Sequence, residues 1–108
     1  MKTKITSSRD VIIQTDKLDE AVRFYKNVLG LRLTQQSQTL AGFETGSFCL
    51  YVEKGTAPGP VFEFCVPDFK AVKKKLIAAG CRVEDENPAI PRCYLRDPFG
   101  LVFNLAES

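Results

Sequence analysis

The sequence contains no histidine in its 108 residues. Without an imidazole there can be no Ser-His or Cys-His catalytic pair, no histidine ligand for zinc or iron, and no side chain whose ordinary pKa lies near neutrality. A long apolar run is also missing, because neither the opening MKTKITSSRD nor any later stretch has the length of a signal peptide core or a membrane span. We therefore expect a cytoplasmic protein that does not use the common histidine-based chemistries.

Cysteine is present but in no recognisable ligand pattern. Cys49, Cys65, Cys81 and Cys93 are separated by 16, 16 and 12 residues and form no CxxC pair. Buried free thiols are common in protein cores, so we expect reduced cysteines and no zinc site.

A concentration of positive charge is missing as well. Fifteen basic and thirteen acidic side chains give a formal charge of +2, without a dense basic block. Neither nucleic acid nor a membrane is therefore an expected partner. What the chain does have is 44% hydrophobic residues, enough for one globular domain over residues 1–108.

Two stretches of the chain follow the same plan. VIIQTDKLDEAVRFYKNVLGLRL begins at Val11, and FEFCVPDFKAVKKKLIAAGCRV begins at Phe62. Each has a short apolar run, an acidic turn, a helical pattern, a glycine and a new strand. GSFCLYVE from Gly46 is then echoed by GLVFNLAE from Gly100, after the tetrads FETG and DPFG. The repeat predicts two βαβββ modules, over about residues 9–54 and 60–107.

Each module should contain one amphipathic helix. In the first helix we expect Asp16 as the N-cap and Gly30 as the stop, and in the second Gly80 as the stop. The apolar residues that recur at helical spacing are Leu18, Ala21, Val22, Tyr25, Val28 and Leu29 in the first, and Phe69, Val72, Leu76 and Ile77 in the second. The charge run Lys73–Lys75 is expected to be a solvated surface.

The fold class that follows is α+β, with the two modules forming one curved mixed sheet and both helices on its convex face. A ferredoxin-like sandwich also places two helices on one sheet face. It explains the internal repeat less well.

Alternation along the strands divides their side chains between the two faces of the sheet. The helix-covered side should receive Val11, Ile13, Phe48, Leu50, Val52, Phe62, Phe64, Val66, Cys93, Leu95, Leu101, Phe103 and Leu105. The opposite side should receive Asp10, Ile12, Gln14, Cys49, Tyr51, Glu53, Val61, Glu63, Cys65, Arg92, Tyr94, Arg96, Val102, Asn104 and Ala106.

This second face is either a solvated surface or a binding concavity. Its mixture of apolar, aromatic and a few polar groups favours a concavity. The candidate ligand-binding residues are Asp10, Gln14, Tyr51, Glu63, Arg92, Tyr94 and Asn104. Asp10 is either an anion for a cationic ligand or a polar strand start beside Arg9. An enclosed Glu63 would need a partner, and Arg92 or Arg96 is expected to supply it.

The segment DKLDEAVRFYKNVLGLRL, the βαβββ duplication and the closing DPFGLVFNL together resemble the vicinal oxygen chelate superfamily. That superfamily includes glyoxalase I, extradiol dioxygenases, fosfomycin-resistance enzymes and bleomycin-resistance proteins. The resemblance extends from Asp10 to Glu107, and its helix motif is L-x-x-A-x-x-F-Y-x-x-x-L-G.

The resemblance implies where a metal ion would be held. The metalloenzymes of the superfamily use mostly histidine and glutamate from the first, fourth, fifth and last strands. Those positions fall on Asp10, near Cys49 or Tyr51, on Val61 and on Asn104. Only Asp10 is a good ligand for a hard or borderline divalent ion. The resemblance therefore implies a member with no cofactor, no metal and no catalytic residue.

The function expected on this basis is metal-free binding of a small, partly aromatic or cationic molecule, for sequestration or resistance. A homodimer is expected by analogy with the bleomycin-resistance proteins. The alternatives are a metal-dependent lyase, isomerase or dioxygenase with an atypical site, metal-free acid-base catalysis in an enclosed pocket, and a dimeric scaffold without a ligand.

Overall fold

The computed structural model describes residues 4–108, and contacts within the chain divide it into two units. The N-terminal unit is Arg9–Pro60, and the C-terminal unit is Val61–Ser108 together with the described residues 4–8. No helix in the described part of the chain is long and apolar enough to cross a membrane.

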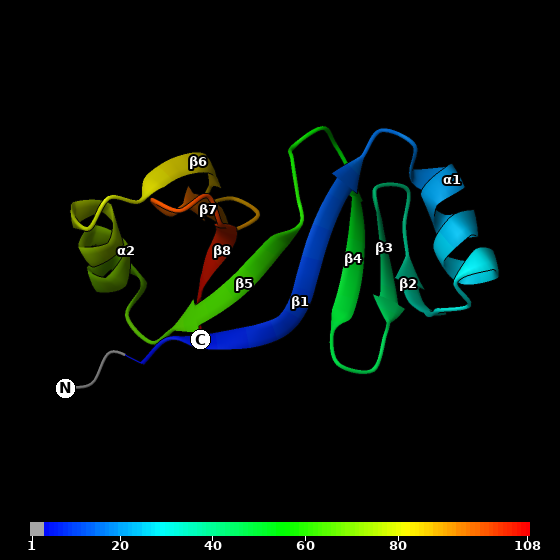
Figure 1. The fold of residues 1–108 in the computed structure, drawn as a ribbon, viewed down its shortest axis with the longest axis horizontal. Helices are drawn as coiled ribbons and strands as arrows, with labels where there is room; N and C mark the ends of the chain where they lie inside the picture. Colours follow the sequence, from blue (N-terminus) through cyan, green and yellow to red (C-terminus); the bar gives the residue numbers. More distant parts are fainter. Residues whose placement is uncertain (1–3) are drawn as a thin grey trace. The chain divides into compact units, whose positions relative to one another are not determined.

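The N-terminal unit contains four strands and one helical segment (Figure 1). Its elements are β1 (Thr6–Thr15), α1 (Leu18–Arg23), the π-helical turn η1 (Phe24–Val28), β2 (Arg32–Gln36), β3 (Leu40–Glu44) and β4 (Cys49–Lys54). The strand order is β2-β3-β4-β1. β1 and β4 are parallel, and the other neighbours are antiparallel.

The C-terminal unit repeats this arrangement. Its elements are β5 (Val61–Val66), α2 (Phe69–Ala78), β6 (Arg82–Asn87), β7 (Arg92–Arg96) and β8 (Val102–Glu107). The strand order is β5-β8-β7-β6, with β5 and β8 parallel and the other neighbours antiparallel. The α+β class with mixed strand pairing is thereby confirmed.

Turns and caps explain where the helices begin and end. Gly30 and Gly80 follow the helices with φ of 74° and 111°, a conformation that costs other residues more than glycine. The N-cap of α2 is Asp68, whose carboxylate accepts a hydrogen bond from the Ala71 N–H at 3.1 Å. The expected N-cap Asp16 is wrong, since α1 begins at Leu18 after Lys17 without a side-chain cap.

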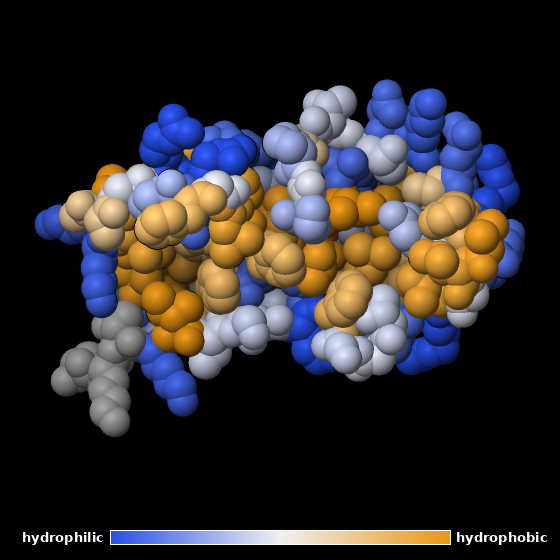
Figure 2. Space-filling model, viewed as in Figure 1, coloured by the Kyte–Doolittle hydropathy of each residue, from blue (hydrophilic) through white to orange (hydrophobic). Residues whose placement is uncertain are grey.

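The first helix departs from regular α-helical geometry after Arg23. The N–H of Leu29 donates to the carbonyl of Phe24, five residues earlier, at 3.1 Å. This wider turn rotates the following side chains away from the apolar stripe. Val28 and Leu29, expected in the core, are 70% and 55% exposed. Figure 2 shows apolar side chains at the surface over this end of the helical segment.

Each helix packs on one face of the sheet in its own unit. The N-terminal core consists of Leu18, Val22, Ala41, Phe43, Leu50 and Val52. The C-terminal core consists of Val66, Val72, Cys81, Cys93, Leu95, Phe103 and Leu105, with Phe64, Phe69 and Leu76 packed against it. The expected alternation of core residues is confirmed along most of β4, β7 and β8.

Four further residues expected in the core are instead exposed. Phe48 and Leu101 lie one residue before β4 and β8 begin, so neither is held over the helix-covered face by strand pairing. Phe62 is near the start of β5 and Ile77 near the end of α2. Each of these two residues stands one position from the end of its element, where the neighbouring layer covers a side chain less completely.

Candidate functional site

The candidate residues of the N-terminal unit share the sheet face opposite α1. Strand register aligns Asp10 with Cys49 and Glu44, and Gln14 with Glu53. Tyr51 lies beside Ile12 on β1 and Gly42 on β3. Residues directly opposite each other on paired strands point to the same side, so the register confirms the expected face for all three candidates.

The candidates of the C-terminal unit form a row across its strands. Glu63 on β5 is opposite Asn104 on β8, and Asn104 is opposite Tyr94 on β7. Asp85 on β6 continues the row beside Tyr94. The structure therefore brings three of the four candidates in this unit into direct register.

Asn104 is the buried polar residue of this row, with 8% of its surface exposed. Its Oδ1 accepts a hydrogen bond from the backbone N–H of Cys93 at 2.9 Å. Its Nδ2 donates to Oε2 of Glu63 at 3.0 Å. The amide therefore links β5, β8 and β7, with both of its polar atoms used inside the protein.

The two arginines expected beside Glu63 pair with other carboxylates. Arg92 donates to Asp85 at 3.2 Å and places its guanidinium 4.9 Å from the centre of the Tyr94 ring. Arg96 donates to Glu84 at 3.2 Å, and this hydrogen bond lowers the pKa of Glu84. The expected pairing of Glu63 with Arg92 or Arg96 is wrong, because register places Asn104 beside it.

Gln14 holds a loop in place. Its Nε2 donates to Glu53 at 3.2 Å, and its Oε1 accepts from the backbone N–H of Ala57 at 2.9 Å. The side chain also fills the space next to Gly55, where a β-carbon would collide with it. One end of this amide bonds to β4 and the other to the chain that follows it, so Gln14 has a structural role in addition to its predicted place on the face.

Tyr51 provides half-buried aromatic surface on the same face. Its ring lies over Gly42, where an added β-carbon would be 3.0 Å from the ring edge. The absence of a side chain at position 42 is what lets the ring lie against the sheet. Tyr94, in contrast, is buried beneath the Arg92 guanidinium.

An ion-pair cluster on this face was missed by the sequence analysis. Arg9 donates from Nη2 to Oε2 of Glu44 at 2.6 Å and to the carbonyl of Gly46 at 2.9 Å. The pKa of Glu44 is lowered to about 2, mainly by the hydrogen bond from Arg9 and secondly by the hydrogen bond from the Gly46 N–H. Cys49 Sγ lies 3.6 Å from Arg9 and 3.7 Å from Glu44. The β1–β4 and β3–β4 registers, which sequence patterns do not reveal, bring these groups together.

The donors on this face do not fit a divalent metal ion. Among residues 4–108, no group of three or more histidine, cysteine, aspartate or glutamate side chains is placed to hold one. Val61 has no donor atom, and Oδ1 of Asn104 accepts the Cys93 N–H. The Arg9 guanidinium contacts Glu44 and Cys49, in the same row as Asp10. The positively charged Arg9 side chain therefore lies beside Asp10, the ligand position on the first strand.

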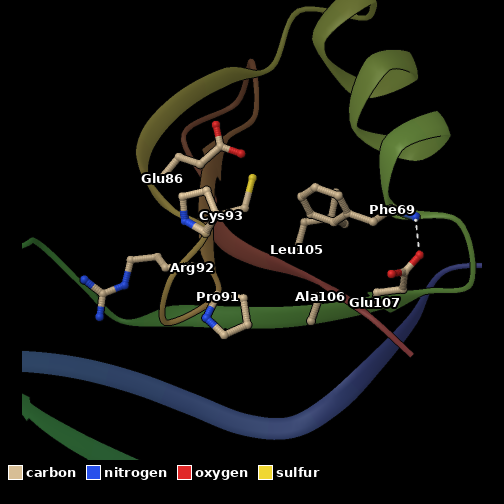
Figure 3. A pocket seen from close by; sticks show the side chains of 9 residues that line it. Phe69, Glu86, Pro91, Arg92, Cys93, Leu105, Ala106 and Glu107 are labelled. Atoms are coloured by element: carbon tan, nitrogen blue, oxygen red, sulfur yellow. Dashed lines mark hydrogen bonds between the residues drawn. The ribbon is translucent and has the colours of Figure 1, made fainter.

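A separate cavity of about 370 Å³ lies in the C-terminal unit (Figure 3). It is lined by Phe69, Glu86, Pro88, Pro91, Arg92, Cys93, Leu105, Ala106 and Glu107. Apart from Arg92, none of these was a candidate. The charge run Lys73–Lys75 lies at the surface as expected, with Lys74 and Lys75 exposed and the part-exposed Lys73 in an ion pair with Glu86 at 2.6 Å.

The element order of each unit is βαβββ, and a chain that contains two such modules defines the class of protein. The family model of the glyoxalase-like domain matches residues 10–106. The chain therefore belongs to the glyoxalase-like domain family, within the vicinal oxygen chelate superfamily. No curated protein matches the sequence significantly.

Solved structures share this fold at low sequence identity. A glyoxalase/bleomycin resistance protein/dioxygenase superfamily member from Vibrio splendidus has a TM-score of 0.63 and 12% identity, over 99% of this chain and 100% of that one. The Mn(II)-bound glyoxalase from Novosphingobium aromaticivorans has a TM-score of 0.66 and 20% identity, over 98% of this chain and 40% of that one. Homoprotocatechuate 2,3-dioxygenase from Brevibacterium fuscum has a TM-score of 0.61 and 21% identity, over 96% and 37%. The chain thus spans about two-fifths of each of these two enzymes.

Proposed function

We propose that this protein binds a small, partly aromatic molecule on the sheet face opposite its helices, without a metal ion. The observation that carries the proposal is the hydrogen bonding of Asn104. The resemblance places a metal-binding glutamate at this position, and here an amide joins Glu63 to the Cys93 N–H. The strand position that would complete an ion's coordination is used to hold three strands together.

The same face offers groups suited to an organic ligand. In the N-terminal unit this face offers the aromatic surface of Tyr51, and in the C-terminal unit it offers the Arg92 guanidinium, whose position is fixed by Tyr94 and Asp85. A few oriented polar groups beside aromatic surface are typical of small-molecule sites. The alternative function is a metal-dependent lyase or dioxygenase reaction, because the fold is shared with the Mn(II)-bound glyoxalase. Measuring the metal content of the purified protein tests this alternative.

A thermal-shift screen against aromatic compounds, half of them cationic, tests the proposal. A ligand at 100 times its dissociation constant should add about 2.7 kcal/mol to the free energy of unfolding. Tyr51→Ala should abolish the shift, whereas Phe24→Ala, which removes an exposed ring from the helical segment, should preserve it. A broad library without a hit, or hits that do not depend on Tyr51, would refute the proposal and favour a scaffold.

A further inference from the structure

The cavity in the C-terminal unit exists because two strands separate. The β7–β8 pairing ends at Tyr94 and Asn104. β8 nevertheless remains paired with β5 as far as Glu107, and β7 remains paired with β6 as far as Arg92. Continued pairing would place Cys93 opposite Leu105, and both residues instead line the cavity.

Backbone polar groups are directed into this gap. The Ser108 N–H donates to the Val66 carbonyl, so residues 104, 106 and 108 bond to β5 and the alternate residues face β7. Leu105 therefore presents its backbone toward β7. The Cys93 N–H that would have met the Leu105 carbonyl is donated to Asn104 instead. The Asn104 amide thus takes the Cys93 N–H where the ladder ends, and both the N–H and the carbonyl of Leu105 face this gap.

The cavity walls are largely apolar. Phe69 and Leu105 belong to the helix-covered core of the unit, and Pro88 and Pro91 come from the β6–β7 turn. Figure 3 shows the Phe69 ring beside Leu105, with Pro91 across from them. A volume of about 370 Å³ is within the range of small-molecule sites.

The charged side chains of the cavity lining are two carboxylates, Glu86 and Glu107, and one guanidinium, Arg92. The Glu107 carboxylate accepts a hydrogen bond from the Phe69 N–H at 3.3 Å, and the Glu107 side chain is exposed to solvent. Glu86 forms an ion pair with Lys73. The pKa of the Cys93 thiol is raised, mainly because the thiol is buried and secondly because the negative charge of Glu86 is near, so the thiol stays neutral. Arg92, the cationic residue of the lining, pairs with Asp85, and Figure 3 shows its guanidinium directed away from the other side chains.

From this combination we propose that the cavity binds a small organic amine with an aromatic body. The ring lies between Phe69, Pro91 and Leu105, and the ammonium group pairs with Glu107. A carboxylate ligand would face Glu107 and Glu86 without a free cation to receive it. The lining combines residues of the helix-covered core with Arg92 and Ala106 of the other face. Arg92 also serves the function proposed above, but the amine contact assigned here does not use it.

Titration of ¹⁵N-labelled protein with 2-phenylethylamine, followed by NMR, tests this inference. The backbone amides of Phe69, Cys93 and Leu105 should shift in a saturable way, and Phe69 should respond because its N–H contacts Glu107. Phenylacetate, which has the opposite charge, should bind at least about tenfold more weakly. Shifts elsewhere but not at these amides, or equal affinity for the two compounds, would overturn the proposal.

Two matched pairs of variants locate the contact. Glu107→Gln should weaken amine binding at least about fivefold, and Glu20→Gln on exposed α1 should leave it unchanged. Pro91→Phe should fill the cavity and abolish binding, whereas Ile90→Phe, on the same turn but outside the lining, should retain it. Undiminished binding by Glu107→Gln would overturn the assigned ammonium contact. Preserved peak dispersion in each variant controls for folding.

Discussion

Replacing Asn104 with alanine should destabilise the protein far more than a surface polar substitution does. The change leaves the buried Cys93 N–H without its acceptor and removes the donor to the Glu63 carboxylate. An unsatisfied buried group costs about 1–3 kcal/mol, and a hydrogen bond to a charged group contributes about 1.5–3 kcal/mol. Because the two losses share one side chain and the structure relaxes, we expect a combined effect of about 2–4 kcal/mol.

The assay is urea unfolding followed by circular dichroism, with Asn27→Ala as the matched control. Asn27 is an exposed asparagine on η1, and its replacement should change the free energy of unfolding by about 0.5 kcal/mol or less. Each kcal/mol should lower the melting temperature by about 4–8 °C in a domain of this size. A loss of under about 0.5 kcal/mol for Asn104→Ala would refute the account of this amide as a link between strands.

Asn104→Asp separates the two hydrogen bonds. A carboxylate can still accept the Cys93 N–H, but it cannot donate to Glu63 and adds a second negative charge beside it. The variant should therefore be less stable than the parent at neutral pH and should recover part of the loss in acid, where one carboxyl group becomes a donor. A variant as stable as the parent at neutral pH would contradict the assigned orientation of the amide.

Three further predictions concern other parts of the molecule. The Glu44 carboxyl should titrate with a pKa of about 2, below the ordinary value of 4.5. Its contribution to the free energy of unfolding is therefore complete above pH 4.5 and is lost as the pH falls toward 2. An NMR titration of this carboxyl with a midpoint near 4.5 would show that the Arg9 contact is not maintained. Burial raises the pKa of the Cys81 and Cys93 thiols. A thiol reagent at neutral pH should therefore modify the part-exposed Cys49 and Cys65 first. Early modification of Cys93, detected by mass spectrometry, would be inconsistent with a buried thiol at this position. We also propose a homodimer, supported by the exposed apolar Val28 and Leu29, and a monomeric mass by sedimentation at micromolar concentration would exclude it.

The face of each candidate residue could be predicted from sequence because strand alternation is local. Phe103 and Leu105 are core residues, so Asn104 between them must point the other way. The duplicated pattern likewise predicted the order of helices and strands. Both inferences depend only on residues close together in the chain.

The partners of those residues could not be predicted, because they depend on register between strands far apart in sequence. Glu63 is 41 residues from Asn104, and Arg9 is 35 residues from Glu44. Apolar spacing also cannot reveal the wider turn in η1, which moved Val28 and Leu29 to the surface. The cavity depends on where the β7–β8 ladder ends, which no sequence pattern indicated.

Elemental analysis of protein purified from medium supplemented with Mn, Fe, Ni and Zn tests the central claim most directly. The account predicts far less than one equivalent of any of these metals per chain, and no saturable uptake when each is titrated by calorimetry. The reason is that Val61 offers no donor and Asn104 is committed to Cys93 and Glu63. One tightly held ion per chain would contradict the metal-free account and favour a metal-dependent enzyme.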